Sequence, residues 1–281
     1  MAVDLGSARS WLFVPGDRGD RFEKAAASGA DVVICDLEDA VAPGAKVAAR
    51  SEVASWLSRG GTACVRINAH GTPFHDDDVA AVAGLPGLLA VMMPKAEDPD
   101  ALVRLSDALG PGTAVVALIE TALGLHRVND VATARGVARL SFGSIDFALD
   151  LSAEDAALPL LFARSALVLA SRVAGLPAPV DGVTTELDDL PVVAAAARAA
   201  AALGFGGKLC IHPRQVSAVH AGLAPTDEQL EHARQVLAAS ADGSAGRVNG
   251  QMVDVPVTAR ARHLLERNEA RAGTPARDTA T

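Results

Sequence analysis

Charged and polar side chains follow six of the eight short apolar runs in this chain, at the point where each run ends. Carboxylates that meet at one place repel and raise one another's pKa values unless a cation joins them. A hard divalent ion can be held by one or two carboxylates, with water and substrate oxygens completing an octahedron. We therefore expect a magnesium site among these run ends, which are 36–39, 66–68, 94–95, 120–121, 143–146 and 212–213.

The candidate metal ligands are Glu120 and Asp146, which follow the fifth and sixth runs. Glu38 and Asp39 are expected to lie behind them, where they would hold waters or orient the site. Arg66 ends the third run, and its permanently charged guanidinium matches two oxygens of a carboxylate or an enolate. We therefore expect Arg66 to contact a substrate beside the metal.

The histidines argue against zinc as the ion. His70 and His75 share one loop, but no cysteine accompanies them, and His75-Asp76 is expected to cap a helix. His212 precedes Pro213, and we interpret it as a structural residue at a strand end. Magnesium remains the favoured ion.

Three basic residues, Arg18, Arg21 and Lys24, recur every third position at the start of a helix expected over 18–28. This spacing forms a ridge on one side of the helix. The ridge could hold phosphate groups, and an ordinary solvated basic face is the alternative.

The apolar runs alternate with longer alanine-rich stretches of helical spacing, a pattern typical of βα units and a parallel sheet. Each run is continuously apolar, as expected of strands buried on both faces. A doubly wound sheet is the alternative, but the turn 14–17 lacks the glycine pattern of a dinucleotide site. The count favours a TIM (β/α)8 barrel over 1–225. Its strands are expected at 11–14, 32–37, 63–67, 89–93, 114–119, 137–142, 179–183 and 208–211.

A C-terminal helical extension, 226–281, follows the predicted barrel. We expect helices over 227–240 and 255–271, separated by the Gly/Ser/Asn-rich stretch 242–250. The last residues, 272–281, have a composition typical of disorder.

The composition excludes some partners. The 281 residues carry 25 basic and 34 acidic side chains, a net charge of −9, which disfavours nucleic acid and anionic membranes as partners. No apolar run is long enough to span a membrane, and the first ten residues lack the layout of a secretory signal. We expect a cytoplasmic protein with reduced, buried thiols at Cys35, Cys64 and Cys210.

At these residues the chain resembles the citrate lyase β-subunit-like branch of the HpcH/HpaI aldolase family, which includes malyl-CoA and citramalyl-CoA lyases. The resemblance runs from residue 9 to residue 254 and covers nearly the whole chain. The matching stretches are 9–18, 36–39, 65–68, 93–95, 119–121, 143–147, 210–213 and 250–254.

The resemblance implies a Mg²⁺-dependent carbon–carbon lyase on a TIM barrel, commonly assembled as homotrimers or hexamers. It implies that Glu120 and Asp146 hold the metal and that Arg66 contacts the keto acid or enolate. Glu38 and Asp39 would line the site. One departure is Ile145, which stands where many relatives carry an acidic residue directly before the metal-binding aspartate. Asp146 itself is retained, but the residues around the metal, on which substrate identity depends, differ.

The resemblance also assigns the remaining site residues. Lys95 is expected to bind substrate, and Phe13, Arg18 and Lys24 to bind coenzyme A, the two basic residues through its phosphates. Asp254 is expected to reach a neighbouring subunit's site from the C-terminal extension and to act there as general base and acid.

The predicted reaction is reversible cleavage of a 3-hydroxyacyl-CoA, such as malyl-CoA or citramalyl-CoA, into acetyl-CoA and a 2-keto acid. A thioesterase on the same metal site is a second hypothesis. A third is the β-subunit of a multi-protein citrate lyase, which needs a partner that presents an acyl carrier. A metal-binding scaffold without turnover is the simplest alternative.

Overall fold

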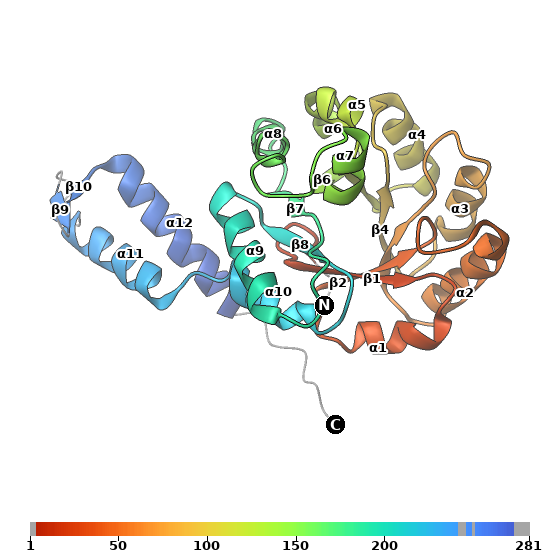
Figure 1. Cartoon of the computed structure of the whole chain (residues 1–281), viewed down its shortest axis with the longest axis horizontal. Coiled ribbons are helices and arrows are strands. Elements are labelled where there is room, and N and C mark those ends of the chain that lie inside the picture. The colour runs from red at the N-terminus through yellow and green to blue at the C-terminus, as the bar shows by residue number, and fades with distance from the viewer. Residues whose placement is uncertain (1–3, 241–245, 249–250, 273–281) are drawn as a thin grey trace. The chain divides into compact units, whose positions relative to one another are not determined.

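The computed structural model describes residues 4–240, 246–248 and 251–272. The chain divides into two compact units, Met1–Leu223 and Ala224–Thr281 (Figure 1).

The first unit is a closed barrel of eight parallel strands in sequence order (Figure 1). Closure is direct, because β1 pairs with β8 as well as with β2, with Trp11 opposite Leu209 and Val32. This confirms the predicted TIM barrel, and the closed ring excludes a doubly wound sheet. The strands are β1 (Ser10–Pro15), β2 (Val32–Asp36), β3 (Ala63–Arg66), β4 (Leu88–Met93), β5 (Ala114–Ile119), β6 (Val137–Phe142), β7 (Val180–Asp181) and β8 (Gly207–Cys210).

Helices connect the strands and cover the outside of the barrel (Figure 1). Local signals set several of their ends: Asp98 caps α4 by accepting from the Asp100 N–H, and Gly204, at φ 109°, ends α9. The helical elements are η1 (Gly19–Arg21), α1 (Phe22–Ala26), η2 (Pro43–Ala45), α2 (Lys46–Ser58), α3 (His75–Val82), α4 (Pro99–Leu109), α5 (Ala122–His126), α6 (Val128–Thr133), α7 (Ser144–Asp150), α8 (Leu161–Val173), α9 (Leu190–Leu203) and α10 (Gln215–Leu223).

Two predicted elements are shorter than expected. The helix expected over 18–28 is a 3-10 turn followed by the five-residue α1, because Gly19 weakens its first turn and Gly29, at φ 81°, lies beyond its end. The strand expected over 179–183 is only Val180–Asp181, because Pro179 has no N–H to donate to the sheet.

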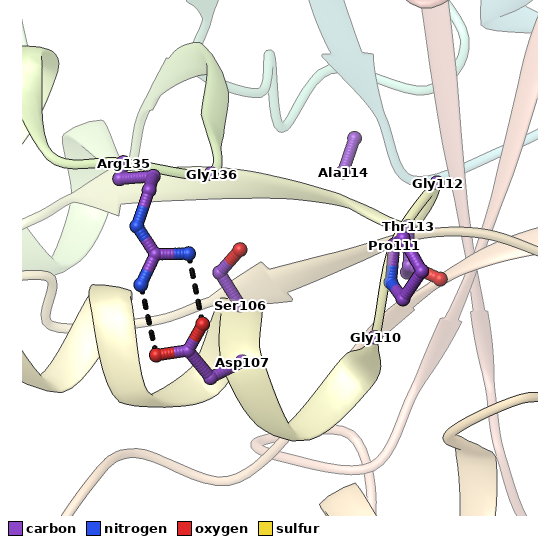
Figure 2. A pocket seen from close by; sticks show the side chains of 9 residues that line it. All are labelled: Ser106, Asp107, Gly110, Pro111, Gly112, Thr113, Ala114, Arg135 and Gly136. Carbon is purple, nitrogen blue, oxygen red and sulfur yellow. Dashed lines mark hydrogen bonds and ion pairs between the residues drawn. The ribbon is translucent and has the colours of Figure 1, made fainter.

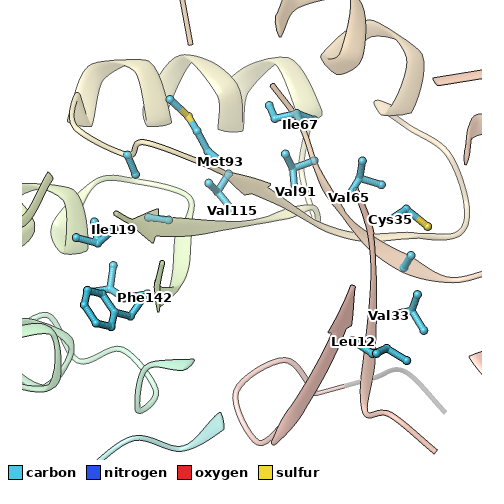
Figure 3. Packing of buried hydrophobic residues seen from close by; sticks show 14 of the residues in the cluster. Leu12, Val33, Cys35, Val65, Ile67, Val91, Met93, Val115, Ile119 and Phe142 are labelled. Carbon is cyan, nitrogen blue, oxygen red and sulfur yellow. The ribbon is translucent and has the colours of Figure 1, made fainter. Parts of the chain in front are cut away.

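The strands are buried on both faces, which explains their continuously apolar sequences. Side chains that point inward fill the barrel, among them Trp11, Ile34, Cys64 and Leu118. Side chains on the outer faces pack beneath the helices (Figure 3). The outer cluster includes Leu12, Val33, Cys35, Val65, Ile67, Val91, Met93, Val115, Ile119 and Phe142.

The second unit contains α11 (Asp227–Ala239), the antiparallel pair β9 (Gly246–Val248) and β10 (Gln251–Val253), and α12 (Val255–Ala272). A capping box of Thr226 and Gln229 begins α11. Of the residues predicted to be disordered, 272–281, Ala272 is the last residue of α12, and 273–281 lie outside the described residues, as does part of the predicted linker 242–250.

Two further expectations bear on the chain's surroundings. Cys35, Cys64 and Cys210 are free and buried, as predicted. Within the described ranges, the helices are too short or too polar to cross a lipid bilayer.

Candidate active site

The alternation of side chains along the strands brings the predicted site residues together. Every second residue of a barrel strand points inward. The residue two positions after an inward core residue such as Trp11, Ile34, Cys64 or Leu118 therefore also points inward. Those positions at the carboxyl ends of β1, β2, β3 and β5 are Phe13, Asp36, Arg66 and Glu120. This end of a TIM barrel is where active sites are built.

Arg66 is held on three sides. Its Nε and Nη2 donate to Asp36 Oδ1 and Oδ2 at 2.8 and 2.6 Å, and its guanidinium carbon lies 4.8 Å from the Phe13 ring centre. The remaining nitrogen, Nη1, lies 3.1 Å from Glu38 Oε2 and 3.5 Å from Asp39 Oδ2. Burial alone would lower the pKa of Arg66, but its pKa is raised because Asp36, Glu38 and Asp39 together outweigh burial. Arg66 is therefore a fixed cation with one nitrogen facing the site.

Glu38 stands between the two cations of the site. Its Oε1 accepts from Lys95 Nζ at 3.2 Å, while its Oε2 faces Arg66. In the described part of the chain, Oε2 is buried and accepts no hydrogen bond. Burial raises the pKa of Glu38, with Arg66 and Lys95 acting in the opposite direction. Glu38 thus has one buried oxygen that forms an ion pair with Arg66 and accepts no hydrogen bond within the described ranges.

The ammonium of Lys95 lies beside two acidic residues of the predicted site, Glu38 and Glu120. Nζ lies 3.2 Å from Glu38 Oε1 and 3.6 Å from Glu120 Oε1, and the Lys95 main-chain N–H donates to Glu120 Oε1 at 3.0 Å. The backbone takes φ 46° at Lys95, a left-handed conformation that is rare for a lysine. Burial opposes the charge on Lys95, but Glu38 and Glu120 outweigh it and raise its pKa.

Glu120 is almost fully buried at the end of β5. Burial, the charge of Glu38 and, more weakly, that of Asp146 raise the pKa of Glu120 to about 8. The start of the β6–α7 connection leaves room for its carboxylate, since a Cβ on Gly143 would lie 2.6 Å from Glu120 Oε2. Asp146, half-buried in the first turn of α7, lies near enough for its charge to contribute to this raised pKa.

The donor set fits a hard divalent cation. Five carboxylates and two cations meet at this end of the barrel, so the named groups carry a net charge of −3 when all are ionised. The described ranges hold no cluster of three or more His, Cys, Asp or Glu side chains with metal-ligand geometry. Two carboxylates completed by water and substrate oxygens are the ligand set that Mg²⁺ accepts. The seven groups are Asp36, Glu38, Asp39, Glu120, Asp146, Arg66 and Lys95.

The predicted basic ridge has a different form from the one expected. Arg18 precedes the 3-10 turn and forms a bidentate pair with Asp20, Arg21 lies in the turn, and Lys24 lies in α1. The field of Lys24 reaches His212 after β8, where burial, Arg214 and Lys24 together lower the histidine's pKa. Lys24 therefore belongs to the surroundings of the β8 end, while Arg18 has a carboxylate partner of its own.

Asp254 lies in the second unit. It is exposed between β10 and α12, and its Oδ1 accepts from the Val257 N–H at 3.1 Å. It therefore caps α12 in the single chain, and its catalytic role stays a prediction.

Several residues that shape the site were not singled out in the sequence. Asp36 is the main partner of Arg66, and the two face each other in the register of β2 and β3. Asn68 donates to the Leu37 carbonyl and to Asp78, and Lys46 donates to the same carbonyl from α2. Asp36 stands in the run end 36–39, but its partner follows only from the pairing of β2 with β3. His75, expected to cap a helix, instead lies buried with Nδ1 2.9 Å from the Asn68 carbonyl oxygen.

A hollow elsewhere on the barrel has no such chemistry. It lies at the amino ends of β5 and β6, opposite the carboxylates, beside the exposed ion pair of Arg135 and Asp107 (Figure 2). Since that pair is exposed and mutually neutralised, the hollow carries no functional assignment.

Comparison with known proteins decides the family. The sequence model of the HpcH/HpaI aldolase/citrate lyase family matches residues 9–213. The chain belongs to this family. This confirms both the predicted family and its lyase class. A family member from Deinococcus radiodurans, named citrate lyase subunit beta-like protein, is 37% identical over 277 residues, which cover 92% of this chain and 96% of that protein.

Other members of the family carry more specific names. The L-malyl-CoA/beta-methylmalyl-CoA lyase of Cereibacter sphaeroides is 34% identical over 301 residues, covering 93% of this chain and 94% of that lyase. Citrate lyase subunit beta of Escherichia coli K12 is 34% identical, covering 93% of each chain. The two names stand for different substrates.

Solved structures of family members share the fold. CitE from Mycobacterium tuberculosis, in complex with magnesium, acetoacetate and coenzyme A, has a TM-score of 0.84 and 37% identity, covering 94% of this chain and 100% of that one. The citrate lyase beta subunit from the same organism, complexed with oxaloacetate and magnesium, has a TM-score of 0.69 and 35% identity, covering 79% and 99%.

Proposed function

We propose that this chain is a Mg²⁺-dependent lyase that reversibly cleaves a 3-hydroxyacyl-CoA, such as malyl-CoA or citramalyl-CoA, into acetyl-CoA and a 2-keto acid. The observation that carries the proposal is the meeting of Glu120, Glu38, Arg66 and Lys95 at the carboxyl end of the barrel, within ion-pair distances of 3.1–3.6 Å. The magnesium, keto-acid and coenzyme A complexes of the M. tuberculosis proteins support it.

Glu120 and Asp146 would hold the magnesium ion. When bound, the ion supplies a Lewis acid that polarises the keto or hydroxyl oxygen of the substrate. The buried Glu38 Oε2 and the carboxylate of Asp39 would then accept hydrogen bonds from waters around the ion. Lys95, beside Glu120, would bind the carboxylate of the 2-keto acid.

Arg66 would stabilise the charge that develops during cleavage. The hydroxyl group on C3 loses its proton, the C2–C3 bond breaks, and its electron pair moves into the thioester as an enolate. Because Asp36 occupies Nε and Nη2, Arg66 presents Nη1 in a fixed position toward that charge. A proton returned to C2 gives acetyl-CoA, and C3 becomes the carbonyl of the keto acid.

Asp254 of a neighbouring subunit would remove and return that proton, and Phe13, Arg18 and Lys24 would contact coenzyme A. Such an arrangement needs a homo-oligomer, and we propose a homotrimer or hexamer. An exposed apolar face on α8 supports this assembly, because exposed apolar patches mark protein interfaces. Its residues, 63–78% exposed and on one side of the helix by their spacing, are Phe162, Leu169 and Val173.

The test is a mass-spectrometric screen of the condensation direction. Purified chain, Mg²⁺ and acetyl-CoA or propionyl-CoA are incubated with a panel of 2-keto acids that includes glyoxylate, pyruvate and oxaloacetate. We expect a new 3-hydroxyacyl-CoA mass that disappears on adding EDTA and in Glu120→Ala and Asp146→Ala. Full activity in either variant would sink the metal assignment.

The same assay separates the other hypotheses. A thioesterase would release a free coenzyme A thiol, which a thiol reagent detects, whereas a lyase leaves the thioester intact. A citrate lyase β-subunit, as the similarity to the E. coli protein allows, would be inactive on free CoA thioesters until a partner protein presented an acyl carrier. Turnover of a free CoA thioester by the purified chain would exclude that dependence.

A further inference from the structure

Lys46 is a buried cation directly behind the site. It begins α2, its side chain is 6% exposed, and Nζ donates to the carbonyl oxygens of Leu37 and Glu38, at 2.7 Å each. The ammonium also lies 5.6 Å from the centre of the Phe74 ring. Among the described residues, both of its hydrogen bonds go to main-chain carbonyls, and neither goes to a carboxylate.

Satisfying those carbonyls does not require a lysine. The Leu37 carbonyl also accepts from Asn68 Nδ2 at 2.9 Å, and the Glu38 carbonyl from the Val41 N–H at 3.0 Å. An apolar side chain at position 46 would therefore leave neither oxygen unpaired. Burying an ammonium without a counter-charge is costly, so this lysine contributes something that a methionine could not.

The two carbonyls belong to the segment that aims Glu38. Immediately after them, the Glu38 carboxylate faces Arg66 at 3.1 Å and Lys95 at 3.2 Å. The Leu37 carbonyl is fixed from the other side as well, because Asn68 is held by Asp78. Lys46 and Asn68 thus hold the main chain at 37–38 from two sides. This segment places the Glu38 carboxylate between Arg66 and Lys95.

The other buried lysine in the barrel shows the contrast. Lys208 Nζ lies 2.9 Å from Asp181 Oδ2, so this buried ammonium has a carboxylate partner, which it shares with Arg164. Within the described ranges, Lys46 pairs with no carboxylate, and its charge lies against the main chain of residues 37–38.

We propose that Lys46 is a positioning residue, which fixes the main chain at 37–38 and thereby holds the Glu38 carboxylate in its catalytic position. The proposal rests on the proposed lyase function for its kinetic consequences only. The restraint on the segment 37–45 can be measured without any substrate.

The experiment compares Lys46→Met, Lys46→Arg and Lys208→Met in the full-length protein. Methionine keeps the volume and removes the charge and the donors, arginine keeps both, and Lys208→Met removes a buried lysine elsewhere. Each variant is measured by steady-state condensation of acetyl-CoA with the best 2-keto acid, by unfolding midpoint, and by hydrogen exchange of peptides that cover 37–45.

We expect Lys46→Met to lower kcat by about 10- to 100-fold with KM changed less than about threefold, because misplaced catalytic groups reduce turnover more than binding. Amides in 37–45 should exchange at least about tenfold faster. Lys46→Arg should recover most of both effects. Lys208→Met should lower the unfolding midpoint and leave kcat of the folded protein and the exchange of 37–45 unchanged.

Wild-type kcat and wild-type exchange in Lys46→Met would overturn the proposal. The same pattern in Lys46→Met and Lys208→Met would also overturn it, since it would show a stabilising role alone. If the wild type condenses none of the keto acids but exchange at 37–45 responds as expected, the lyase function fails and the positioning role stands.

Discussion

Asp36 holds Arg66 through two parallel hydrogen bonds, Nε to Oδ1 at 2.8 Å and Nη2 to Oδ2 at 2.6 Å, between residues that face each other on β2 and β3. Both side chains are buried. The pair leaves one guanidinium nitrogen to face substrate, so the orientation of Arg66 depends on Asp36.

We predict that Asp36→Asn destabilises the protein by about 3–5 kcal/mol, because the buried guanidinium loses the carboxylate that holds two of its nitrogens. Only the contacts of Nη1 with Glu38 and Asp39 would then orient Arg66, and kcat/KM should fall by about 100-fold. Urea unfolding and steady-state kinetics measure the two effects. The matched control is Asp107→Asn, which breaks an equally short bidentate pair with Arg135 on the surface and should leave both quantities unchanged. Equal effects in the two variants would contradict this reading of Asp36.

The pKa of Glu120, raised to about 8 by burial and by Glu38, predicts a pH-dependent metal affinity. Magnesium binds the ionised carboxylate, so its affinity should rise by about tenfold per pH unit below pH 8 and level off above it. Titration calorimetry with Mg²⁺ between pH 6 and pH 9 measures this. Glu38→Gln removes one cause of the raised pKa and should move the plateau to lower pH, whereas an affinity independent of pH would refute the assignment of Glu120.

The same shift predicts the pH dependence of stability without added metal. A carboxyl group whose pKa is higher in the folded than in the unfolded state binds protons more tightly when folded. Its contribution to stability is complete below the unfolded value of about 4.5 and is lost as pH rises through about 8. Glu120→Gln should flatten the fall in urea midpoint across this window. A fall of the same size in Glu120→Gln would assign the effect to other groups.

A substitution at Gly143 tests by steric displacement whether the Glu120 carboxylate holds the ion. A methyl group there would lie 2.6 Å from both Cβ and Oε2 of Glu120, so Gly143→Ala must displace the Glu120 side chain. We expect Mg²⁺ affinity to fall by at least about tenfold, with a loss of about 1–3 kcal/mol of stability. Gly44→Ala is the control, because its Cβ would meet no heavy atom within 4 Å. Unchanged Mg²⁺ affinity in Gly143→Ala would show that Glu120 does not hold the ion.

The barrel could be predicted from the sequence because burial on both faces leaves a direct trace in composition. Continuous runs such as 114–119 and 137–142 coincide with β5 and β6. The predicted length of the seventh strand was too great. The apolar residues around Pro179 do not show which main-chain N–H groups donate to the neighbouring strands. Composition thus predicted the number of strands better than their lengths.

The contacts within the site were harder to predict from the sequence, because strand register decides which residues of two neighbouring strands face each other. Glu38, Arg66, Lys95 and Glu120 follow strand ends and could be grouped on that basis. The contact between Asp36 and Arg66 could not be predicted, because it depends on the register of β2 against β3 and no residue pattern gives that register. Lys46 reaches the site from a helix eight residues beyond Glu38, so its sequence position alone gives no sign of the contact.

The exposed apolar face of α8 predicts the assembly state. Phe162 and Leu169 are 78% and 63% exposed on α8, and two glutamates there would oppose burial against a second copy. We expect Phe162→Glu/Leu169→Glu to reduce the mass measured by light scattering to that of a monomer. Val192→Glu, at an exposed apolar residue of α9, should leave the assembly intact. An unchanged mass in the double variant would place the interface elsewhere.

Asp254 predicts complementation between inactive subunits. Its Oδ1 caps α12, and asparagine can cap equally well, so Asp254→Asn should fold normally and lose turnover. Co-expressed with Glu120→Gln, it forms mixed oligomers in which some sites combine an intact Glu120 with an intact neighbouring Asp254. Random assembly makes such sites about one quarter of the total, because each condition is met with probability one half. We therefore expect about a quarter of wild-type activity from two inactive parents, measured on the whole co-expressed population purified through a tag that both variants share. If Asp254 acts within its own chain, no mixed site has both groups, and activity stays at the level of the parents.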